Sequence, residues 1–174
     1  MKKIVAFLMT LSIISCKEKN LNLETVKELN INKYVGTWYE IARLPNKFEK
    51  DLECVTATYK IKKDGRIEVI NKGHLFKDHS KVKKIKGTAW VPDKNEPAKL
   101  KVSFFWPFSG KYWVLVLDKE YNYALVGDPS RKYLWVLSKS VKLEEAIYNS
   151  LLETALSKGF DTKKMLLVNQ SCKE

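Results

Sequence analysis

The sequence predicts an all-β fold: an eight-stranded antiparallel up-and-down β-barrel with one C-terminal α-helix packed on the outside. Three observations lead to this prediction. Runs rich in β-branched and aromatic residues alternate with turn signals about every ten residues, a spacing typical of sandwiches and barrels. A single stretch with helical spacing follows the last of these runs. The chain has 174 residues, of which 45% are hydrophobic and 30% charged, and this composition suits one globular core.

The chain begins with an export signal. Residues 1–14 combine a basic start with an apolar stretch that is too short to span a bilayer. The run Ile13-Ile14-Ser15-Cys16 resembles the bacterial lipobox. We therefore predict a lipoprotein signal peptide over residues 1–15 and a lipidated Cys16 that attaches the mature protein to a membrane. An ordinary signal peptide with a chance cysteine is the alternative.

The mature chain divides into a tether and one domain. Residues 16–33 are polar and mixed in charge, so we expect them to join the lipidated cysteine to the folded part. Residues 34–174 carry the strand and helix signals and form the predicted barrel domain. Lys17, in place of Asp, resembles the pattern of lipoproteins exported beyond the inner membrane. The expected location is therefore the bacterial cell envelope, with a lipid anchor in the outer membrane.

Eight strands are expected, each bounded by residues with turn chemistry. They lie at residues 37–44, 54–62, 66–73, 82–91, 98–105, 111–117, 121–127 and 132–138. Closure into a barrel removes exposed sheet edges, and eight strands leave an interior that side chains fill or that holds one small ligand. The small residues Ala57, Gly87 and Ala89 favour a cavity over a solid barrel.

One helix is expected after the last barrel strand. Ser140 is its predicted N-cap, because a hydroxyl can accept a hydrogen bond from the first turn. Apolar residues from Leu143 to Leu156 recur at helical spacing, so one face should pack against the barrel wall. Gly159 ends the helix, and residues 165–168 form a short final strand.

The head of the first strand carries a family motif. Gly36-Thr37-Trp38 resembles the G-x-W motif of the lipocalins. The runs at residues 55–59, 100–105 and 133–138 look like those of the bacterial outer-membrane lipoprotein lipocalins and their apolipoprotein D-like relatives. The resemblance covers residues 34–170, and it implies a protein that binds a small hydrophobic molecule inside the barrel.

One position departs from the family pattern. Lipocalins usually have Arg just after the last barrel strand, stacked across the motif tryptophan, whereas this chain has Lys139. A lysine can still make a cation–π contact but lacks the planar guanidinium. We expect Trp38 and Lys139 to close the bottom of the barrel as structural residues that need not touch a ligand.

Alternation along the strands predicts which side chains face the cavity. The expected ligand-binding residues are Val55, Ala57, Tyr59, Val69, Asn71, Val102, Phe104, Tyr112, Val114, Tyr133 and Trp135. Val116 is also expected inside, and Thr56 is expected in water. This interior is aliphatic and aromatic with few polar groups, as in pockets that bury an amphiphile.

Four segments are expected at the open end of the barrel. They are residues 45–53, 74–81, 105–110 and 127–132. The third carries Phe105-Trp106-Pro107-Phe108, and lysines occur in or near all four. Such a cluster either packs on itself or contacts a membrane, and the lysines would suit anionic lipid headgroups. Scattered solvated lysines are the alternative.

Two cysteines remain besides Cys16. Cys54 and Cys172 form an even pair in an exported protein, which predicts a disulfide. Two free thiols that lie too far apart are the alternative.

Motifs for other activities are missing from the sequence. There is no Gly-x-Ser-x-Gly elbow, phosphate loop or Cys-x-x-Cys. His74 and His79 have no cysteine or carboxylate cluster around them, so neither a metal site nor a cofactor is expected. The formal net charge of +12 suits anionic partners, but we expect no nucleic acid for an exported lipoprotein. The sequence leaves the oligomeric state open.

These observations predict a binding protein rather than an enzyme. By resemblance to the lipocalins, the ligand would be a fatty acid or lysophospholipid that the protein stores or transports in the envelope. Two alternatives stay open. One is a lipocalin-fold enzyme, for which Cys54 is the candidate thiol, and the other is a ligand-free envelope scaffold or adhesion protein with a solid barrel.

Overall fold

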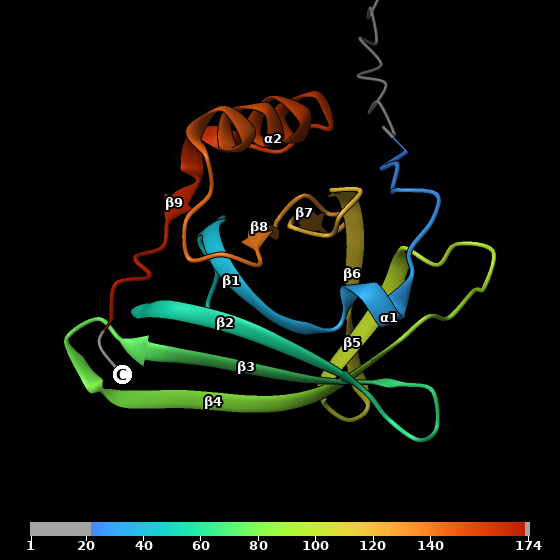
Figure 1. Cartoon of the computed structure of the whole chain (residues 1–174), viewed down its shortest axis with the longest axis horizontal. Coiled ribbons are helices and arrows are strands. Elements are labelled where there is room, and N and C mark those ends of the chain that lie inside the picture. Colours follow the sequence, from blue (N-terminus) through green and yellow to red (C-terminus); the bar gives the residue numbers. More distant parts are fainter. Residues whose placement is uncertain (1–21, 173–174) are drawn as a thin grey trace, which may run out of the picture.

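The computed structural model describes residues 22–172, which form a barrel of antiparallel strands with one long helix outside it (Figure 1). The barrel strands are β1 (Gly36–Arg43), β2 (Leu52–Ile61), β3 (Ile67–Leu75), β4 (Asp78–Trp90), β5 (Lys99–Phe105), β6 (Phe108–Leu117), β7 (Tyr123–Gly127) and β8 (Leu134–Ser138). The other elements are α1 (Ile31–Tyr34), α2 (Glu145–Ser157), the 3-10 helix η1 (Thr162–Lys164) and β9 (Leu166–Leu167). The predicted signal peptide and Cys16 lie outside the described residues.

Hydrogen bonding closes the sheet into a barrel. The strand order is β2-β3-β4-β5-β6-β7-β8-β1-β9, and β2 also pairs with β1. The pairs are antiparallel, so the predicted eight-stranded up-and-down barrel is confirmed. Strands β4 and β6 begin earlier than predicted, at Asp78 and Phe108. Their hairpins turn over only two residues each, 76–77 and 106–107, and the flanking residues join the strands.

The C-terminal tail completes the wall between β1 and β2. These two strands pair only where residues 36–39 face residues 56–59. Further along β1, β9 takes the place of β2 as its neighbour. The Gln170 side chain donates hydrogen bonds to the carbonyls of Glu40 in β1 (2.8 Å) and Val55 in β2 (3.0 Å). The tail therefore bridges the two strands where their own ladder ends.

The predicted disulfide is present in this tail. Cys54 and Cys172 are bonded, with their Cα atoms 6.1 Å apart. The Cys54 N–H also donates to the carbonyl of Asn169 at 2.8 Å. A covalent bond and a backbone hydrogen bond thus hold the end of the chain on β2.

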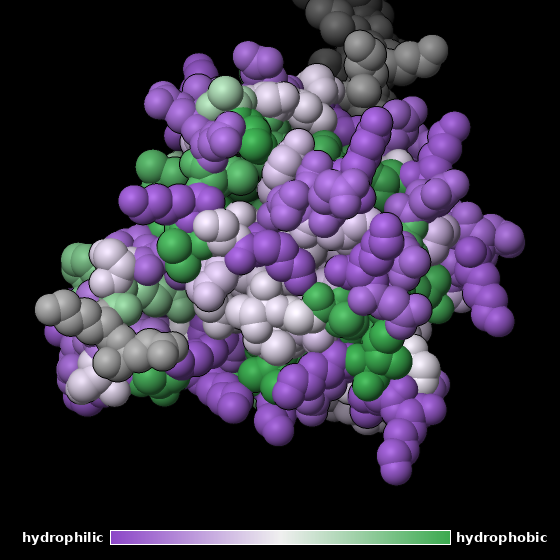
Figure 2. Space-filling view, in the orientation of Figure 1, coloured by the Kyte–Doolittle hydropathy of each residue, from purple (hydrophilic) through white to green (hydrophobic). Residues whose placement is uncertain are grey.

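Helix α2 lies outside the barrel, as predicted. Its residues Leu151 and Ala155 are buried in an outer core that includes Ala42, Leu125 and Val136 from the barrel wall. Figure 1 shows α2 on the side of β1, β7 and β8. Outward side chains of these strands are consequently apolar, whereas polar side chains cover much of the face shown in Figure 2.

The predicted start of this helix is wrong. Helix α2 begins at Glu145, and its N-cap residue is Glu144, whose side chain makes no capping hydrogen bond. Ser140 lies in a bend, where its hydroxyl accepts a long hydrogen bond from the Lys142 N–H. The hydroxyl therefore stabilises a local turn instead of a helix terminus. Serine side chains accept hydrogen bonds from nearby backbone N–H groups in both settings, so the sequence alone does not distinguish them. The predicted apolar face is also narrower than expected, because Leu156 is exposed.

A bulge in β6 changes which side chains point inward. The pairing of β6 with β7 shifts register between Val114 and Val116. Val114 belongs to the inner core, whereas Leu115 and Val116 both pack in the outer core under α2. The prediction that Val116 faces the barrel interior is therefore wrong, because strict alternation does not continue across a bulge.

The segment before β1 is packed on the barrel. Leu23 is buried in the outer core and Leu29 in the inner core. The Val26 N–H donates to the carbonyl of Val114 at 3.0 Å. The part of the expected tether from residue 22 onward is thus attached to the domain. Its few apolar side chains are buried, although most of their neighbours in the sequence are polar. No helix among residues 22–172 has both the length and the apolar character needed to cross a membrane.

Candidate ligand-binding site

The bottom of the barrel is closed around Trp38. This side chain is fully buried, and its indole N–H donates to the carbonyl of Tyr34 at 2.7 Å. Lys139 Nζ lies 4.4 Å from the centre of the Trp38 ring and donates to the carbonyl of Val35 at 2.7 Å. Gly36 has a φ of +99°, and a Cβ there would lie 3.2 Å from Lys139 Nζ. The expected Trp38–Lys139 contact is present, and glycine leaves room for it.

Three tyrosines form the next layer. The hydroxyl of Tyr112 lies 2.7 Å from that of Tyr34 and 2.9 Å from that of Tyr59. Burial raises the pKa of all three hydroxyls, so they stay neutral at physiological pH. The cluster fixes the floor of the interior and leaves polar oxygens facing an otherwise apolar space.

A cavity extends from these tyrosines toward the open end. The space available to the centre of a water molecule is about 90 Å³. Nine of the eleven predicted ligand-binding residues line it: Val55, Ala57, Tyr59, Val69, Asn71, Val102, Phe104, Tyr112 and Trp135. Thr56, expected in water, also borders it. Strand alternation therefore located most of the wall.

The other two predicted residues lie beside the cavity rather than in its wall. Val114 is completely buried in the inner core near Trp38. The ring of Tyr133 stacks on that of Trp135, with centroids 6.0 Å apart and an interplanar angle of 8°, and lies 6.0 Å from Phe48. Tyr133 precedes β8, so its ring lies with that of Phe48 at the open end of the barrel.

A buried charge cluster lies at the upper end of the cavity. Arg43 donates to the Glu40 carboxylate at 2.6 Å and to the carbonyls of Glu49 (2.9 Å) and Leu52 (3.0 Å). The Trp135 indole N–H donates to Glu49 Oε2 at 3.0 Å. Both Glu40 and Glu49 border the cavity, and neither was predicted from the sequence. Glu40 could have been found, because it is two residues after Trp38 and shares its face of β1.

Comparison with known proteins agrees with this architecture. Residues 29–170 match the family described as "Lipocalin-like domain". The chain belongs to this lipocalin family. It is 43% identical over 145 residues to the "Outer membrane lipoprotein Blc" of Escherichia coli, covering 83% of this chain and 81% of that one. The protein of the same name from Vibrio cholerae is 37% identical over 171 residues, covering 98% of this chain and 99% of that one.

A solved structure supports the same assignment. Insecticyanin from the tobacco hornworm Manduca sexta superposes with a TM-score of 0.68 at 25% sequence identity, covering 85% of this chain and 84% of that chain. The resemblance inferred from the G-x-W motif is therefore confirmed. A lipocalin barrel with a largely apolar internal cavity is typical of proteins that bind small hydrophobic ligands.

Glu40 is a buried carboxyl group at the cavity of this lipocalin. Burial raises the pKa of its carboxyl well above the ordinary value of 4.5, and the charge of Glu49 raises it further. Arg43 acts in the opposite direction through its charge and hydrogen bond. The cavity thus presents carboxyl groups, and no lysine or arginine borders it among the described residues.

Asn71 supplies one further polar group. Its Oδ1 is a buried side-chain oxygen with no hydrogen-bond partner, the one such atom in residues 22–172. A buried acceptor without a donor costs free energy, and a ligand hydroxyl or ammonium in the cavity could satisfy it.

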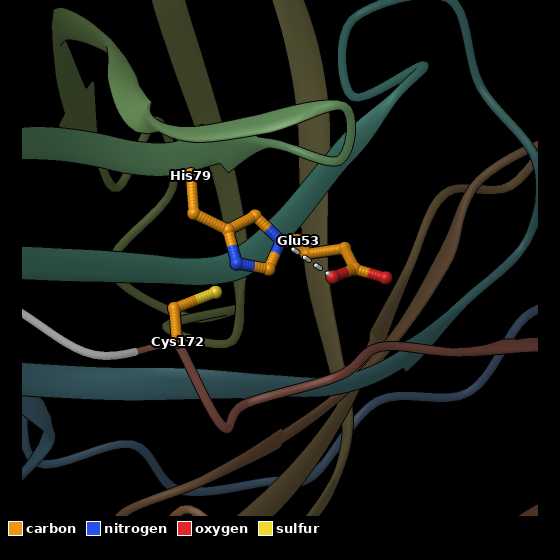
Figure 3. Close-up of side chains that lie close together, drawn as sticks. All are labelled: Glu53, His79 and Cys172. Atoms are coloured by element: carbon orange, nitrogen blue, oxygen red, sulfur yellow. Dashed lines mark hydrogen bonds and ion pairs between the residues drawn. The ribbon is translucent and has the colours of Figure 1, made fainter.

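The candidate thiol of the enzymatic alternative is not in the cavity wall. Cys54 is bonded to Cys172, and neither residue borders the cavity. The structure also corrects the expectation that no cysteine or carboxylate accompanies the two histidines. Glu53 and Cys172 lie close to His79, as Figure 3 shows.

Proposed function

We propose that this lipocalin stores or transports a fatty acid or lysophospholipid in the bacterial envelope. The observation that carries the proposal is the internal cavity, whose walls are aliphatic and aromatic except for the tyrosine hydroxyls, Thr56, Asn71, Glu40 and Glu49. An acyl chain would gain about 0.8 kcal/mol for each methylene group moved from water into such a space. The outer-membrane location predicted from the lipobox agrees with relatives that are named outer membrane lipoproteins.

The size of the cavity implies that side chains move when a long acyl chain binds. Ligand pockets usually enclose several hundred Å³, on the order of 300–1,000 Å³. The space described here is about 90 Å³. Trp135 and Phe104 border the cavity and are only partly buried, so a rotation of either ring toward solvent would widen the space. We infer that these two rings admit the acyl chain.

The polar groups favour a lysophospholipid over a fatty acid. Glu49 borders the cavity, so an ionised fatty-acid carboxylate that reached it would approach a group of like charge, whereas the raised pKa of Glu40 favours the neutral form of that carboxyl. A lysophospholipid with an ammonium headgroup would bring positive charge to Glu49 and hydrogen-bond donors to both carboxyl groups. Asn71 Oδ1 would accept from such a donor or from a glycerol hydroxyl.

The open end of the barrel carries the groups that a lipid-transfer protein needs at a membrane surface. Phe48, Phe76 and the tip Phe105-Trp106-Pro107-Phe108 have exposed aromatic rings, and they come from three different loops. Lysines adjoin these loops, including Lys47, Lys50 and Lys77. We infer that this rim contacts lipid headgroups while Cys16 anchors the chain.

Mass spectrometry of bound lipid tests the proposal. We expect organic extracts of the purified protein, and native spectra of the intact protein, to contain a single-chain lipid in the wild type. Ala57→Phe should remove it, because Ala57 borders the cavity and a larger ring would fill the space. Thr58→Phe is the matched control, since the neighbouring side chain lies on the outer face and bonds Thr37. A wild-type protein without lipid, or equal lipid in both variants, would support the solid-barrel alternative.

A further inference from the structure

One corner of the barrel outside the cavity gathers four side chains with metal-binding chemistry. Glu53 and Cys54 lie in β2, His79 lies at the start of β4, and Cys172 lies in the C-terminal tail. The donor atoms of Glu53, His79 and Cys172 all lie within 4.8 Å of one another, as Figure 3 shows. Cys54 brings a fourth donor, because its sulfur is bonded to that of Cys172.

Neighbouring groups already hold this corner in place. His79 Nε2 lies 3.1 Å from Glu53 Oε2, and the Asn169 side chain donates to the same carboxylate oxygen at 3.0 Å. The His79 carbonyl lies 2.6 Å from His74 Nδ1, which fixes the backbone of the hairpin. The His79 and Glu53 side chains keep 40% and 19% of their exposure, so an ion from solvent can reach them.

The redox state of the two sulfurs decides how many strong donors the corner has. In the oxidised protein the sulfurs are bonded to each other and neutral, which leaves one imidazole and one carboxylate. A dithiol reductant transfers two electrons and two protons, so that the S–S bond breaks, two thiols form and the reductant becomes a disulfide. Each thiol loses its proton to solvent when it binds a metal ion.

We propose that reduction of the Cys54–Cys172 disulfide converts this corner into a Zn²⁺ site with Cys54, Cys172, His79 and Glu53 as ligands. Two thiolates, an imidazole and a carboxylate are donors that tetrahedral zinc accepts. Zinc–ligand bonds of about 2.0–2.3 Å place neighbouring donor atoms about 3.3–3.8 Å apart. Donors that already lie within 4.8 Å need only a small approach to reach this arrangement.

The bound ion would replace the covalent link of the tail. Asn169 and Gln170 hydrogen-bond to β1 and β2 independently of the two sulfurs, so these bonds would keep Cys172 near Cys54 when the disulfide is open. Zinc would then join β2, the β3–β4 hairpin and the tail at one point. The seam between β1 and β2 would be fastened by the disulfide in the oxidised protein and by the metal in the reduced one.

Cobalt titration of the mature protein tests this site. The protein is reduced with a phosphine, the phosphine is removed without oxygen, and Co²⁺ is added while absorbance is recorded. We expect one equivalent to bind, with a sulfur-to-cobalt charge-transfer band and the intense visible bands of tetrahedral cobalt, and Zn²⁺ should displace it. The oxidised protein should show no sulfur-to-cobalt band. Absence of the band in the reduced protein would overturn the proposal.

Variants separate the four-ligand site from thiols that bind metal alone. His79→Gln and Glu53→Gln should each weaken binding at least about tenfold, and a C54S/C172S double variant should lose the band. Glu120→Gln, an exposed carboxylate in the loop after β6, is the matched control and should bind like the wild type. Unchanged affinity in His79→Gln, or loss of the β-sheet circular dichroism on reduction, would also refute the site. None of these readouts involves lipid, so a negative result leaves the proposed lipid binding untouched.

Discussion

At the residue scale, Glu40 should make the stability of the barrel depend on pH. Burial raises its pKa in the folded protein well above the ordinary 4.5. Between the two pKa values the folded state therefore holds a proton that the unfolded state has lost, and stability falls as the pH rises through this window. Glu40→Gln has no such titration. We therefore expect the free energy of unfolding of the variant to increase relative to that of the wild type as the pH is raised from about 4.5 toward neutrality.

Urea denaturation at a series of pH values measures this difference. Glu120→Gln serves as the control, because this carboxylate is exposed and should follow the wild-type pH curve. Parallel curves for Glu40→Gln and the wild type would show that the raised pKa has no counterpart in stability.

Single side chains also show where sequence reasoning succeeds and fails. Alternation from Lys139 and along the regular strands placed most of the cavity wall, because a β-strand turns every second side chain inward. Tyr133 shares the face of Trp135, on which it stacks, but it precedes the first residue of β8 and does not border the cavity. Glu49 escaped because it lies in an irregular loop and reaches the cavity through Arg43 and Trp135, contacts that only the folded chain creates.

At the scale of elements, the C-terminal tail should contribute strongly to stability. The disulfide closes a loop of 118 residues, and the chain-entropy model gives such a link about 4–5 kcal/mol. We expect the C54S/C172S variant, without added metal, to lose stability of this order in urea unfolding. Hydrogen exchange should speed up first where Cys54 donates to Asn169, at the seam between β1 and β2.

Amides between β6 and β7 are the internal control for this experiment, because that pairing does not involve the tail. A variant that loses less than about 1 kcal/mol, with unchanged exchange at the seam, would mean that β9 and Gln170 hold the tail unaided.

The β5–β6 hairpin should contribute to membrane contact. Trp106 is 86% exposed and Phe108 77% exposed at its tip. In a chain carrying Cys16→Ser, which removes the anchor, we expect a W106S/F108S variant to sediment several-fold less with vesicles containing anionic phospholipid than the chain with its aromatic tip. Burial of these rings in the headgroup region is the physical reason.

Leu156→Ser is the matched control for the hairpin variant, because Leu156 is also exposed but lies on α2. Equal vesicle binding by all three chains would show that the aromatic tip does not face the membrane.

The strands were easier to predict than their boundaries and attachments. Turn chemistry marks a hairpin reliably, but Asp78 and Phe108 could equally belong to a loop until pairing partners are known. The attachment of residues 22–33 depends on Leu23 and Leu29, which stand among polar residues and belong to no helix or strand. Burial against the folded domain decides where such a segment lies, and the local sequence pattern does not reveal that burial.

At the scale of the whole molecule, the wall of the closed barrel separates an outer core from an inner core, and the two differ in polarity. The outer core under α2 is built from hydrophobic side chains of the barrel wall and the helix, and it stabilises the fold. The inner core is apolar at Trp38 and gains polar groups above it, first the tyrosine hydroxyls of the floor and then Asn71 and the charge cluster. Polar groups of this kind cost stability in a barrel that only needs to fold, which fits an interior shaped for a ligand with a polar end.

This distribution of charge predicts which amphiphile the molecule prefers. Lysophosphatidylethanolamine offers an ammonium group to Glu49, whereas palmitate offers a carboxylate to the same group. We expect the wild type to bind the lysophospholipid at least about tenfold more tightly, a difference of about 1.4 kcal/mol. Glu49→Gln should narrow this ratio, because the amide oxygen still accepts from Trp135 while the charge is gone. Competition against a fluorescent fatty acid measures both affinities, with Glu120→Gln as control, and an unchanged ratio in Glu49→Gln would place the headgroup away from this cluster.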